Sequence, residues 1–178
     1  MLKRTCLLLL VFLIVASLAL GQYDEKNILT QQAYQLMAQR KYAEAEKMFE
    51  QILQKFPNDA NSVMQLLNIY FQTSQLEKAE DLLKTRRRIL PEKQAAEQEI
   101  LLRIMQGNQN EAWRLSQAHL QRQNHGEGTY RLLAAYFERR GFYDQVLQLY
   151  KDARQKLGKP ELFRLETANA AMNYKLFD

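Results

Sequence analysis

The sequence predicts an all-α fold, built as a stack of antiparallel helix pairs. Apolar residues recur at helical spacing, without the alternation that is typical of strands. Glycine and proline, which weaken or break helices, number only 6 and 3 among 178 residues. Single positions also recur about 34 residues apart, which is the length of a short helix hairpin. One such hairpin cannot bury its own apolar faces, so we expect about four stacked copies and a further C-terminal helix.

The first hairpin lies within residues 33–57 and shows the pattern most clearly. Its apolar residues fall into two blocks, and the polar stretch 39–41 between them predicts the turn. Pro57 ends the second helix, because proline lacks the N–H group that would continue it. Ala33 and Ala45 are expected where the two helices approach most closely, since larger side chains there would push the helices apart.

The later hairpins repeat this arrangement and carry a shared residue pattern. Alanine is followed by an apolar residue four positions on and then by proline, at Ala45, Phe49 and Pro57 and again at Ala79, Leu83 and Pro91. The fourth hairpin has Leu133, Ala134, Phe137, Gly141 and Tyr150 at matching positions, and Gly107 precedes Gly141 by 34 residues. With this pattern the chain resembles the tetratricopeptide repeat (TPR) family over roughly residues 26–178.

The resemblance implies a right-handed superhelical stack of antiparallel helix pairs, a TPR-like α-solenoid. In this family the first helices of the pairs line a concave groove, and the second helices cover the convex side. The third unit is the weakest copy, because Ser116 and His119 replace the usual apolar residues. The expected division is a signal peptide at 1–21 and a helical repeat domain at 22–178, with units at about 26–59, 60–93, 94–126 and 127–160 and a partial fifth at 161–178.

Residues 1–21 have the pattern of a secretory signal peptide. Lys3 and Arg4 form a charged start, and the apolar run 6–20 ends in small residues, Ser17, Ala19 and Gly21, at the places that a signal peptidase reads. That run has 15 residues, fewer than the roughly 20 that span a bilayer, so we expect cleavage and export to a periplasmic or extracellular location. The alternative is a membrane anchor formed by residues 6–20. Cleavage would remove Cys6, the only cysteine, and leave no disulfide.

The motifs predict no catalytic, cofactor or metal site, and the chain is expected not to be an enzyme. The net charge of +5 is too small to indicate nucleic acid as a partner. His119 and His125 have no acidic or cysteine partner at metal-ligand spacing. No nucleophile elbow, phosphate-binding loop or dinucleotide-binding motif occurs in the sequence.

A basic run at residues 84–88 allows two interpretations. Its cations, Lys84, Arg86, Arg87 and Arg88, could form an anion site for an acidic partner or a lipid headgroup. The favoured interpretation is a solvated helix end, where positive charges suit the helix dipole.

The resemblance also implies which residues line the groove. They come from the first helix of each unit: Asn27, Thr30 and Tyr34; Asn61, Met64, Asn68 and Phe71; Gln98, Leu102 and Met105; and Arg131, Ala135 and Glu138. Exposed apolar side chains flanked by amides suit an extended peptide or a partner helix, although these side chains could instead pack inside the superhelix. Thr30 and Tyr34 replace the Lys and Asn with which some family members hold a C-terminal carboxylate, so that mode of binding is not expected.

Residues 161–173 are expected to form a further first helix with an exposed apolar side, and residues 174–178 to begin the following turn. Ala168 and Ala171 should take its close-packing positions. Repeat arrays need a polar outer face on their terminal helix, and this segment has few charges. We therefore expect the array to continue, either in a longer parent chain or by self-association through this end. The alternative is a natural end that docks on the fourth unit.

Three functions are compatible with these observations. The favoured one is a non-enzymatic, exported scaffold that binds a protein or peptide partner in its groove. The others are the repeat region of a longer protein with an effector or enzymatic domain beyond residue 178, and a membrane-anchored assembly factor. A fold does not choose between such functions.

The export hypothesis makes a direct prediction about the start of the mature chain. We expect it to begin near Leu20 or Gln22 and to lack Cys6, because a charged start, an apolar run and small residues precede this point. Mass spectrometry of the protein recovered from its native host measures this start. An intact segment 1–20 would favour the membrane anchor.

Overall fold

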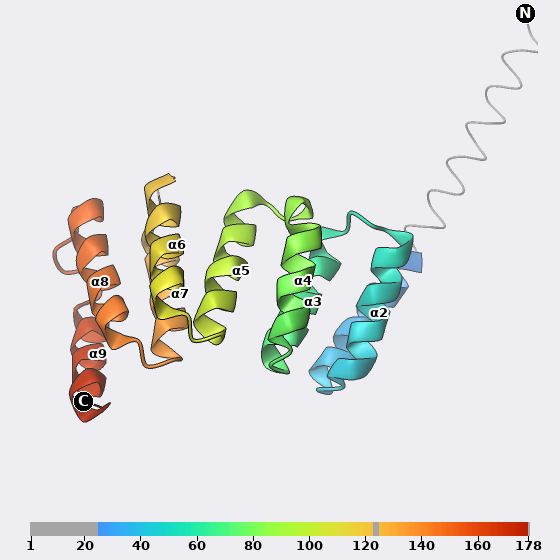
Figure 1. Cartoon of the computed structure of the whole chain (residues 1–178), viewed down its shortest axis with the longest axis horizontal. Helices are drawn as coiled ribbons and strands as arrows, with labels where there is room; N and C mark the ends of the chain where they lie inside the picture. Colours follow the sequence, from blue (N-terminus) through green and yellow to red (C-terminus); the bar gives the residue numbers. More distant parts are fainter. Residues whose placement is uncertain (1–24, 123–124, 178) are drawn as a thin grey trace, which may run out of the picture. The chain divides into compact units, whose positions relative to one another are not determined.

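The structure, a computed structural model, describes residues 25–122 and 125–177, so the predicted signal peptide lies outside it. As predicted, the described part is all-α, with nine α-helices, one short 3₁₀ helix and no strand (Figure 1). A helix at 25–38 is followed by α2 (Tyr42–Lys55), α3 (Ala60–Gln72), α4 (Leu76–Arg86), the 3₁₀ helix η1 (Arg87–Ile89), α5 (Glu92–Met105), α6 (Gln109–Arg122), α7 (Glu127–Glu138), α8 (Tyr143–Leu157) and α9 (Arg164–Phe177). None of these helices combines the length and the apolar character needed to cross a membrane.

The chain forms two compact units, and each is described by itself. Unit 1 ends at Thr73 and holds the helix at 25–38 together with α2 and α3. Unit 2 begins at Ser74 and holds α4 to α9. Within unit 2, α5 packs on α6, α7 on α8 and α8 on α9, so neighbours in sequence are neighbours in space.

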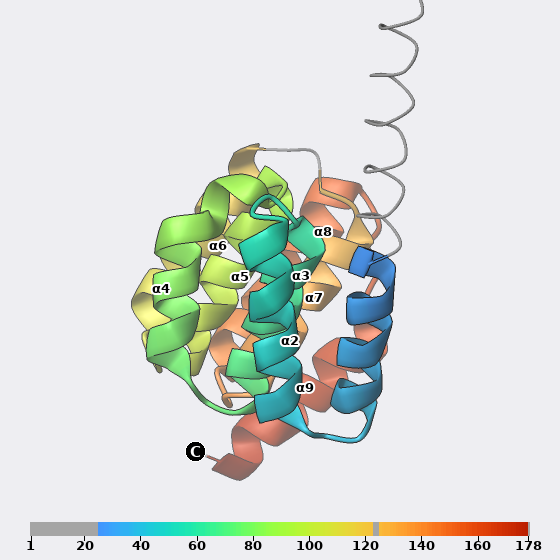
Figure 2. The same cartoon turned by 90° about the vertical axis from the view of Figure 1, so that its right-hand side faces the viewer.

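In unit 1 the helix at 25–38 runs beside α2 (Figure 2). Ala33 and Ala45 are fully buried, as expected for positions where these two helices meet. Asp59 caps α3, because its carboxylate accepts a hydrogen bond of 2.8 Å from the backbone N–H of Ser62. The larger buried side chains of this unit are Phe49, Ile52, Leu53, Val63, Leu66, Leu67, Ile69 and Tyr70.

The core of unit 2 runs from α5 to α9. It contains Ile100, Ile104, Ala112, Leu120, Tyr130, Leu133, Ala134, Phe137, Val146, Leu149, Tyr150, Ala153, Phe163 and Ala170. Trp113 is partly buried, with its ring edge-on to Phe137 at 5.9 Å between centroids. Trp113 is therefore a packing residue of this core.

A residue with a left-handed backbone conformation follows the first helix of each hairpin, at the same position of the repeat. Gly107 and Gly141 have φ angles of 76° and 73°, and Arg40 and Ser74 adopt 58° and 56° without being glycine. The sequence indicated this position only through the two glycines.

A backbone hydrogen bond accompanies the left-handed residue. The N–H groups of Lys41, Asn108 and Phe142 donate to the carbonyl five residues earlier, at 2.9, 2.9 and 3.0 Å. This bond satisfies a carbonyl at the helix end and turns the chain back sharply. The reversal of the chain at the turns after Arg40, Gly107 and Gly141 therefore rests on backbone conformation, and glycine only makes that conformation less costly.

The helix α9 differs from the prediction in its register. Phe163 adopts a left-handed φ of 58° and turns into the core, where its ring lies 4.8 Å from that of Tyr150. The helix begins after this turn, so Ala170 is buried while Ala168 is exposed. The expectation that Ala168 would take a close-packing position is therefore wrong, and Ala171 is only half-buried. The helix also continues through residues 174–177, where the sequence predicted a turn.

Two glycine substitutions in unit 2 test the role of the left-handed turn. Gly141→Ala should lower the free energy of unfolding by about 1–2 kcal/mol, because a Cβ disfavours the left-handed region. The added Cβ would meet Tyr143 only at 3.9 Å, so crowding is not the cause. Chemical denaturation followed by circular dichroism measures the change.

Gly128→Ala is the matched control, since Gly128 lies inside α7 with open space around it. It should raise the free energy of unfolding by about 0.4–1 kcal/mol, because alanine restricts the unfolded chain more than glycine. Equal destabilisation by the two substitutions would contradict this account of the turn.

Candidate partner-binding surface

An exposed aromatic ring stands at the centre of the predicted surface in unit 1. The Tyr34 side chain is 41% exposed, and its hydroxyl donates a hydrogen bond of 2.9 Å to Asn61 Oδ1 on α3. Its ring also lies edge-on to Phe49, with 5.8 Å between centroids. Two contacts from different helices therefore hold this ring in place while one side of it faces solvent.

Two further amide side chains extend this surface. Asn27 lies seven residues before Tyr34, and Asn68 lies seven residues after Asn61, so each shares a helix face with its counterpart. Both are exposed, and Asn68 Nδ2 donates to Gln65 Oε1 at 3.3 Å. We call Asn27, Tyr34, Asn61 and Asn68 the Tyr34 surface.

The remaining predicted residues of unit 1 are less accessible. Thr30, Met64 and Phe71 are half-buried. These three side chains therefore fit neither an open groove nor complete packing inside the superhelix, since part of each packs and part faces solvent.

In unit 2 the predicted groove residues divide into buried and accessible ones. Gln98 and Leu102 are only 6% and 1% exposed, so the expectation that they line an accessible groove does not hold for them. The apolar face of α5 turns these side chains inward. Met105 and Glu138 are half-buried, and Ala135 is exposed.

Arg131 is exposed but engaged in contacts inside unit 2. Its guanidinium donates to Glu166 on α9 at 2.7 Å and to Glu127 at 3.0 Å. It also lies over the Phe163 ring, 4.9 Å from the centroid. The hydrogen bond to Glu166 is the main cause of the raised pKa of Arg131. This side chain joins α7 to α9, so it is less suited to capture a partner.

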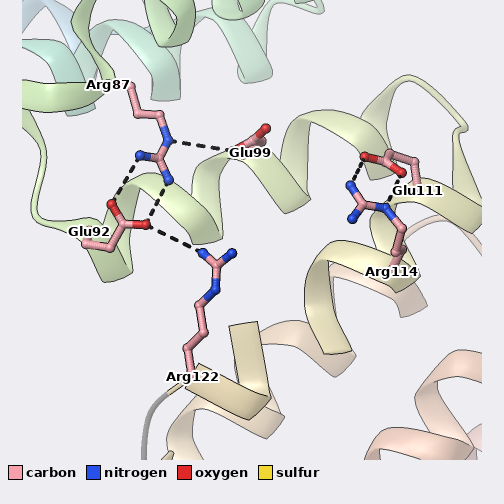
Figure 3. Close-up of polar contacts among 6 residues, drawn as sticks. All are labelled: Arg87, Glu92, Glu99, Glu111, Arg114 and Arg122. Atoms are coloured by element: carbon pink, nitrogen blue, oxygen red, sulfur yellow. Dashed lines mark hydrogen bonds and ion pairs between the residues drawn. The ribbon is translucent and has the colours of Figure 1, made fainter. Parts of the chain in front are cut away.

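In the basic run at residues 84–88, the cations Lys84 and Arg87 pair with carboxylates. Arg87 donates two hydrogen bonds to Glu92, at 3.1 and 2.9 Å, and its Nε lies 3.8 Å from Glu99 (Figure 3). Arg122 approaches Glu92 at 4.0 Å, and Lys84 lies 3.7 Å from Glu80. The bond with Arg87 lowers the pKa of Glu92. The pairs of Lys84 and Arg87 favour the interpretation of the run as a solvated helix end, because they balance part of its charge locally.

Sequence reasoning missed a buried polar group between α5 and α6. Glu97, His119 and His125 are 9%, 7% and 9% exposed, and the two imidazole rings lie 4.4 Å apart. His125 Nε2 lies 2.9 Å from the carbonyl oxygen of His119, and His119 Nε2 lies 3.9 Å from Glu97 Oε1. The sequence carried no signal for it, because Glu97 stands on a different helix, 22 positions before His119.

Burial shifts the pKa values of His119 and Glu97. It lowers the pKa of His119 to about 4, so the imidazole is neutral at pH 7. It also raises the pKa of the Glu97 carboxyl. Across residues 25–122 and 125–177, no set of three or more His, Cys, Asp or Glu side chains is arranged to hold a metal ion.

Comparisons with known proteins bear on the repeat pattern. Residues 36–100, which run from the first helix into α5, match a family model described as "Tetratricopeptide repeat". A thermophilic TPR protein of Thermus thermophilus, known from a crystal structure, is similar to the chain at 18% identity and a TM-score of 0.41, over 83% of this chain and 99% of that one. No match was found among curated proteins.

The family match supports the resemblance inferred from the sequence. It covers the hairpin with Ala45, Phe49 and Pro57 and the hairpin with Ala79, Leu83 and Pro91. Tetratricopeptide repeats generally mediate protein–protein interactions. An interaction surface is therefore the kind of site to look for on this chain.

The buried imidazole of His119 predicts a dependence of stability on pH. Its pKa is about 4 in the folded chain and near 6.5 when exposed, so the unfolded state binds a proton first as the pH falls. The free energy of unfolding should therefore drop between pH 6.5 and 4, by up to about 3 kcal/mol at 1.36 kcal/mol per pKa unit. Denaturation curves across this range measure it.

His119→Gln removes the titrating ring and should flatten this part of the pH profile. Glu97→Gln should make the loss of stability with falling pH steeper. The raised pKa of Glu97 makes the folded state bind a proton before the unfolded state does, which stabilises the fold as the pH falls, and the substitution removes this effect. An unchanged slope in His119→Gln would contradict the assignment to His119.

Proposed function

We propose that this chain is a non-enzymatic scaffold that binds a peptide or a partner helix, and that the Tyr34 surface forms part of its binding site. The observation that carries the proposal is the hydrogen bond between Tyr34 and Asn61, which holds a half-exposed ring across two helices. The match of residues 36–100 to a repeat family that generally mediates protein–protein interactions supports the same function.

The chemistry of the Tyr34 surface suits a polypeptide ligand. Amide side chains such as Asn27 and Asn68 can both donate to and accept from the backbone of an extended peptide. Tyrosine is enriched among residues that dominate binding energies. A ring that is already held by Asn61 and Phe49 loses little conformational freedom when a ligand covers it.

A scaffold also accounts better than an enzyme for the titratable groups. Glu97 and His119, whose pKa values are shifted by burial, are buried among helices. Catalytic acids and bases must reach a substrate in a cleft. The burial of both groups supports a structural role for them.

Export is the second part of the proposal. The charged start, the apolar run 6–20 and the small residues at its end support a scaffold that acts in a periplasmic or extracellular compartment. A mature chain without cysteine suits such a compartment, because no thiol would be open to oxidation there.

Substitution of Tyr34 tests the binding proposal. A partner captured with the tagged full chain is titrated against the parent protein and against Tyr34→Ala. We expect affinity to fall at least about tenfold, because aromatic anchors typically carry about 2 kcal/mol of binding energy. Tyr34→Phe, which keeps the ring and loses the bond to Asn61, should have a smaller effect.

Gln51→Ala is the matched control, because Gln51 is an exposed polar residue on α2 outside the Tyr34 surface. Melting curves recorded in parallel separate binding from folding. Unchanged affinity in Tyr34→Ala, or equal losses in Tyr34→Ala and Gln51→Ala, would rule out the Tyr34 surface as the binding site.

A further inference from the structure

The helix α9 is apolar on two opposite sides. One side faces the core of unit 2 through Ala170, which is 1% exposed, and through Phe163 just before the helix. The other side carries Leu165 and Met172, which are 79% and 60% exposed and are the two most exposed large apolar side chains of the described residues. Surface leucines scattered singly are ordinary, but these two belong to one pattern.

The exposed residues form a continuous strip on one helix face. Leu165, Ala168 and Met172 are spaced by three and four residues, which places them above one another along the helix. Ala170 is two residues from both Ala168 and Met172, about 200° around the helix axis, and so lies on the opposite side. In the described part of the chain no helix covers this strip. We call Leu165, Ala168 and Met172 the α9 strip.

The charges on α9 itself are two basic side chains, Arg164 and Lys175, and one acidic side chain, Glu166. Glu166 accepts a hydrogen bond from Arg131, and Arg164 pairs with Glu161, which lies just before the helix.

These two basic residues border the strip directly. Arg164 and Lys175, both exposed, stand on the same flank of the helix, because their separation of eleven residues is close to three full turns. One edge of the apolar strip is therefore lined by positive charge at both ends.

We propose that the α9 strip docks an amphipathic helix of another polypeptide whose flank carries acidic residues. Leu165 and Met172 supply apolar contacts at the two ends of the strip, and the small Ala168 between them allows a helix to approach closely. Acidic side chains on the bound helix would pair with Lys175 and with Arg164, whose own ion pair with Glu161 is exposed to solvent. This surface lies within unit 2 and does not depend on the Tyr34 surface.

A second copy of this chain fits the strip less well. Two identical helices that pack antiparallel about a two-fold axis bring the same flanks together. Arg164 of one copy would then face Lys175 of the other, and like charges in this arrangement oppose association. The charge pattern therefore favours an acidic partner over self-association through α9.

A pair of designed peptides tests this proposal on the full chain. One probe is a labelled amphipathic helix of about three heptads, long enough to be helical in water, with leucines along one face and glutamates along one flank. The other has lysine in place of each glutamate. Fluorescence anisotropy should show binding of the glutamate peptide, weakened by added salt, and at least tenfold weaker binding of the lysine peptide.

Substitutions on the protein complete the test. Leu165→Gln with Met172→Gln should weaken binding of the glutamate peptide at least about tenfold, and Lys175→Glu should reduce the preference for it. Ile28→Gln is the matched control, because Ile28 is 56% exposed on the helix at 25–38, and it should leave the affinity unchanged.

Three results would overturn the proposal. One is equal binding of the two peptides, and another is equal loss in the Ile28 and Leu165/Met172 variants. The third is light scattering that shows a dimer of the parent chain which Leu165→Gln with Met172→Gln dissociates, since a second copy would then occupy the strip. Because the α9 substitutions are on exposed residues, circular dichroism should show unchanged helicity. The Tyr34 titration is independent of all three results.

Discussion

A helix hairpin of about 34 residues cannot cover its own apolar sides, and this constraint shapes the whole chain. Each helix must offer one apolar side to its partner in the hairpin and another to the next hairpin. In unit 2 the result is one core that continues from Ile100 to Ala170. The helix α9 also has two apolar sides, as a helix inside a stack does, because Leu165 and Met172 are exposed on the side away from the core.

Stacked hairpins also need turns of similar geometry between their helices. A left-handed residue and a hydrogen bond across five residues recur at these turns. Arg40 and Ser74 adopt the conformation as Gly107 and Gly141 do, at some cost in backbone energy. Ala33 and Ala45, on the two helices that the Arg40 turn connects, are fully buried.

Several charged side chains that could bind a partner instead contact other residues of their own unit. Arg131 joins α7 to α9, and Arg87 is held between Glu92 and Glu99. The sequence made both arginines candidates for binding, yet both already form hydrogen bonds or ion pairs with carboxylates of the same unit. Tyr34 differs, because its contacts with Asn61 and Phe49 leave one side of the ring open to solvent. The strongest candidates for binding are therefore the exposed groups that the stack holds in place without covering.

The sequence by itself determined the all-α fold, the length of the hairpins and the positions of their small residues. Periodic apolar residues, scarce helix breakers and alanines such as Ala45 carry this information locally, within a few turns of chain. Only the tertiary structure decided which side chains of a helix face solvent. Leu102 and Tyr34 were equivalent candidates in the sequence, but one is buried and the other open. It also decided the close approach of Glu97 to His119 and the shifted register of α9. These features depend on contacts between helices that are distant in sequence, and no local pattern records such contacts.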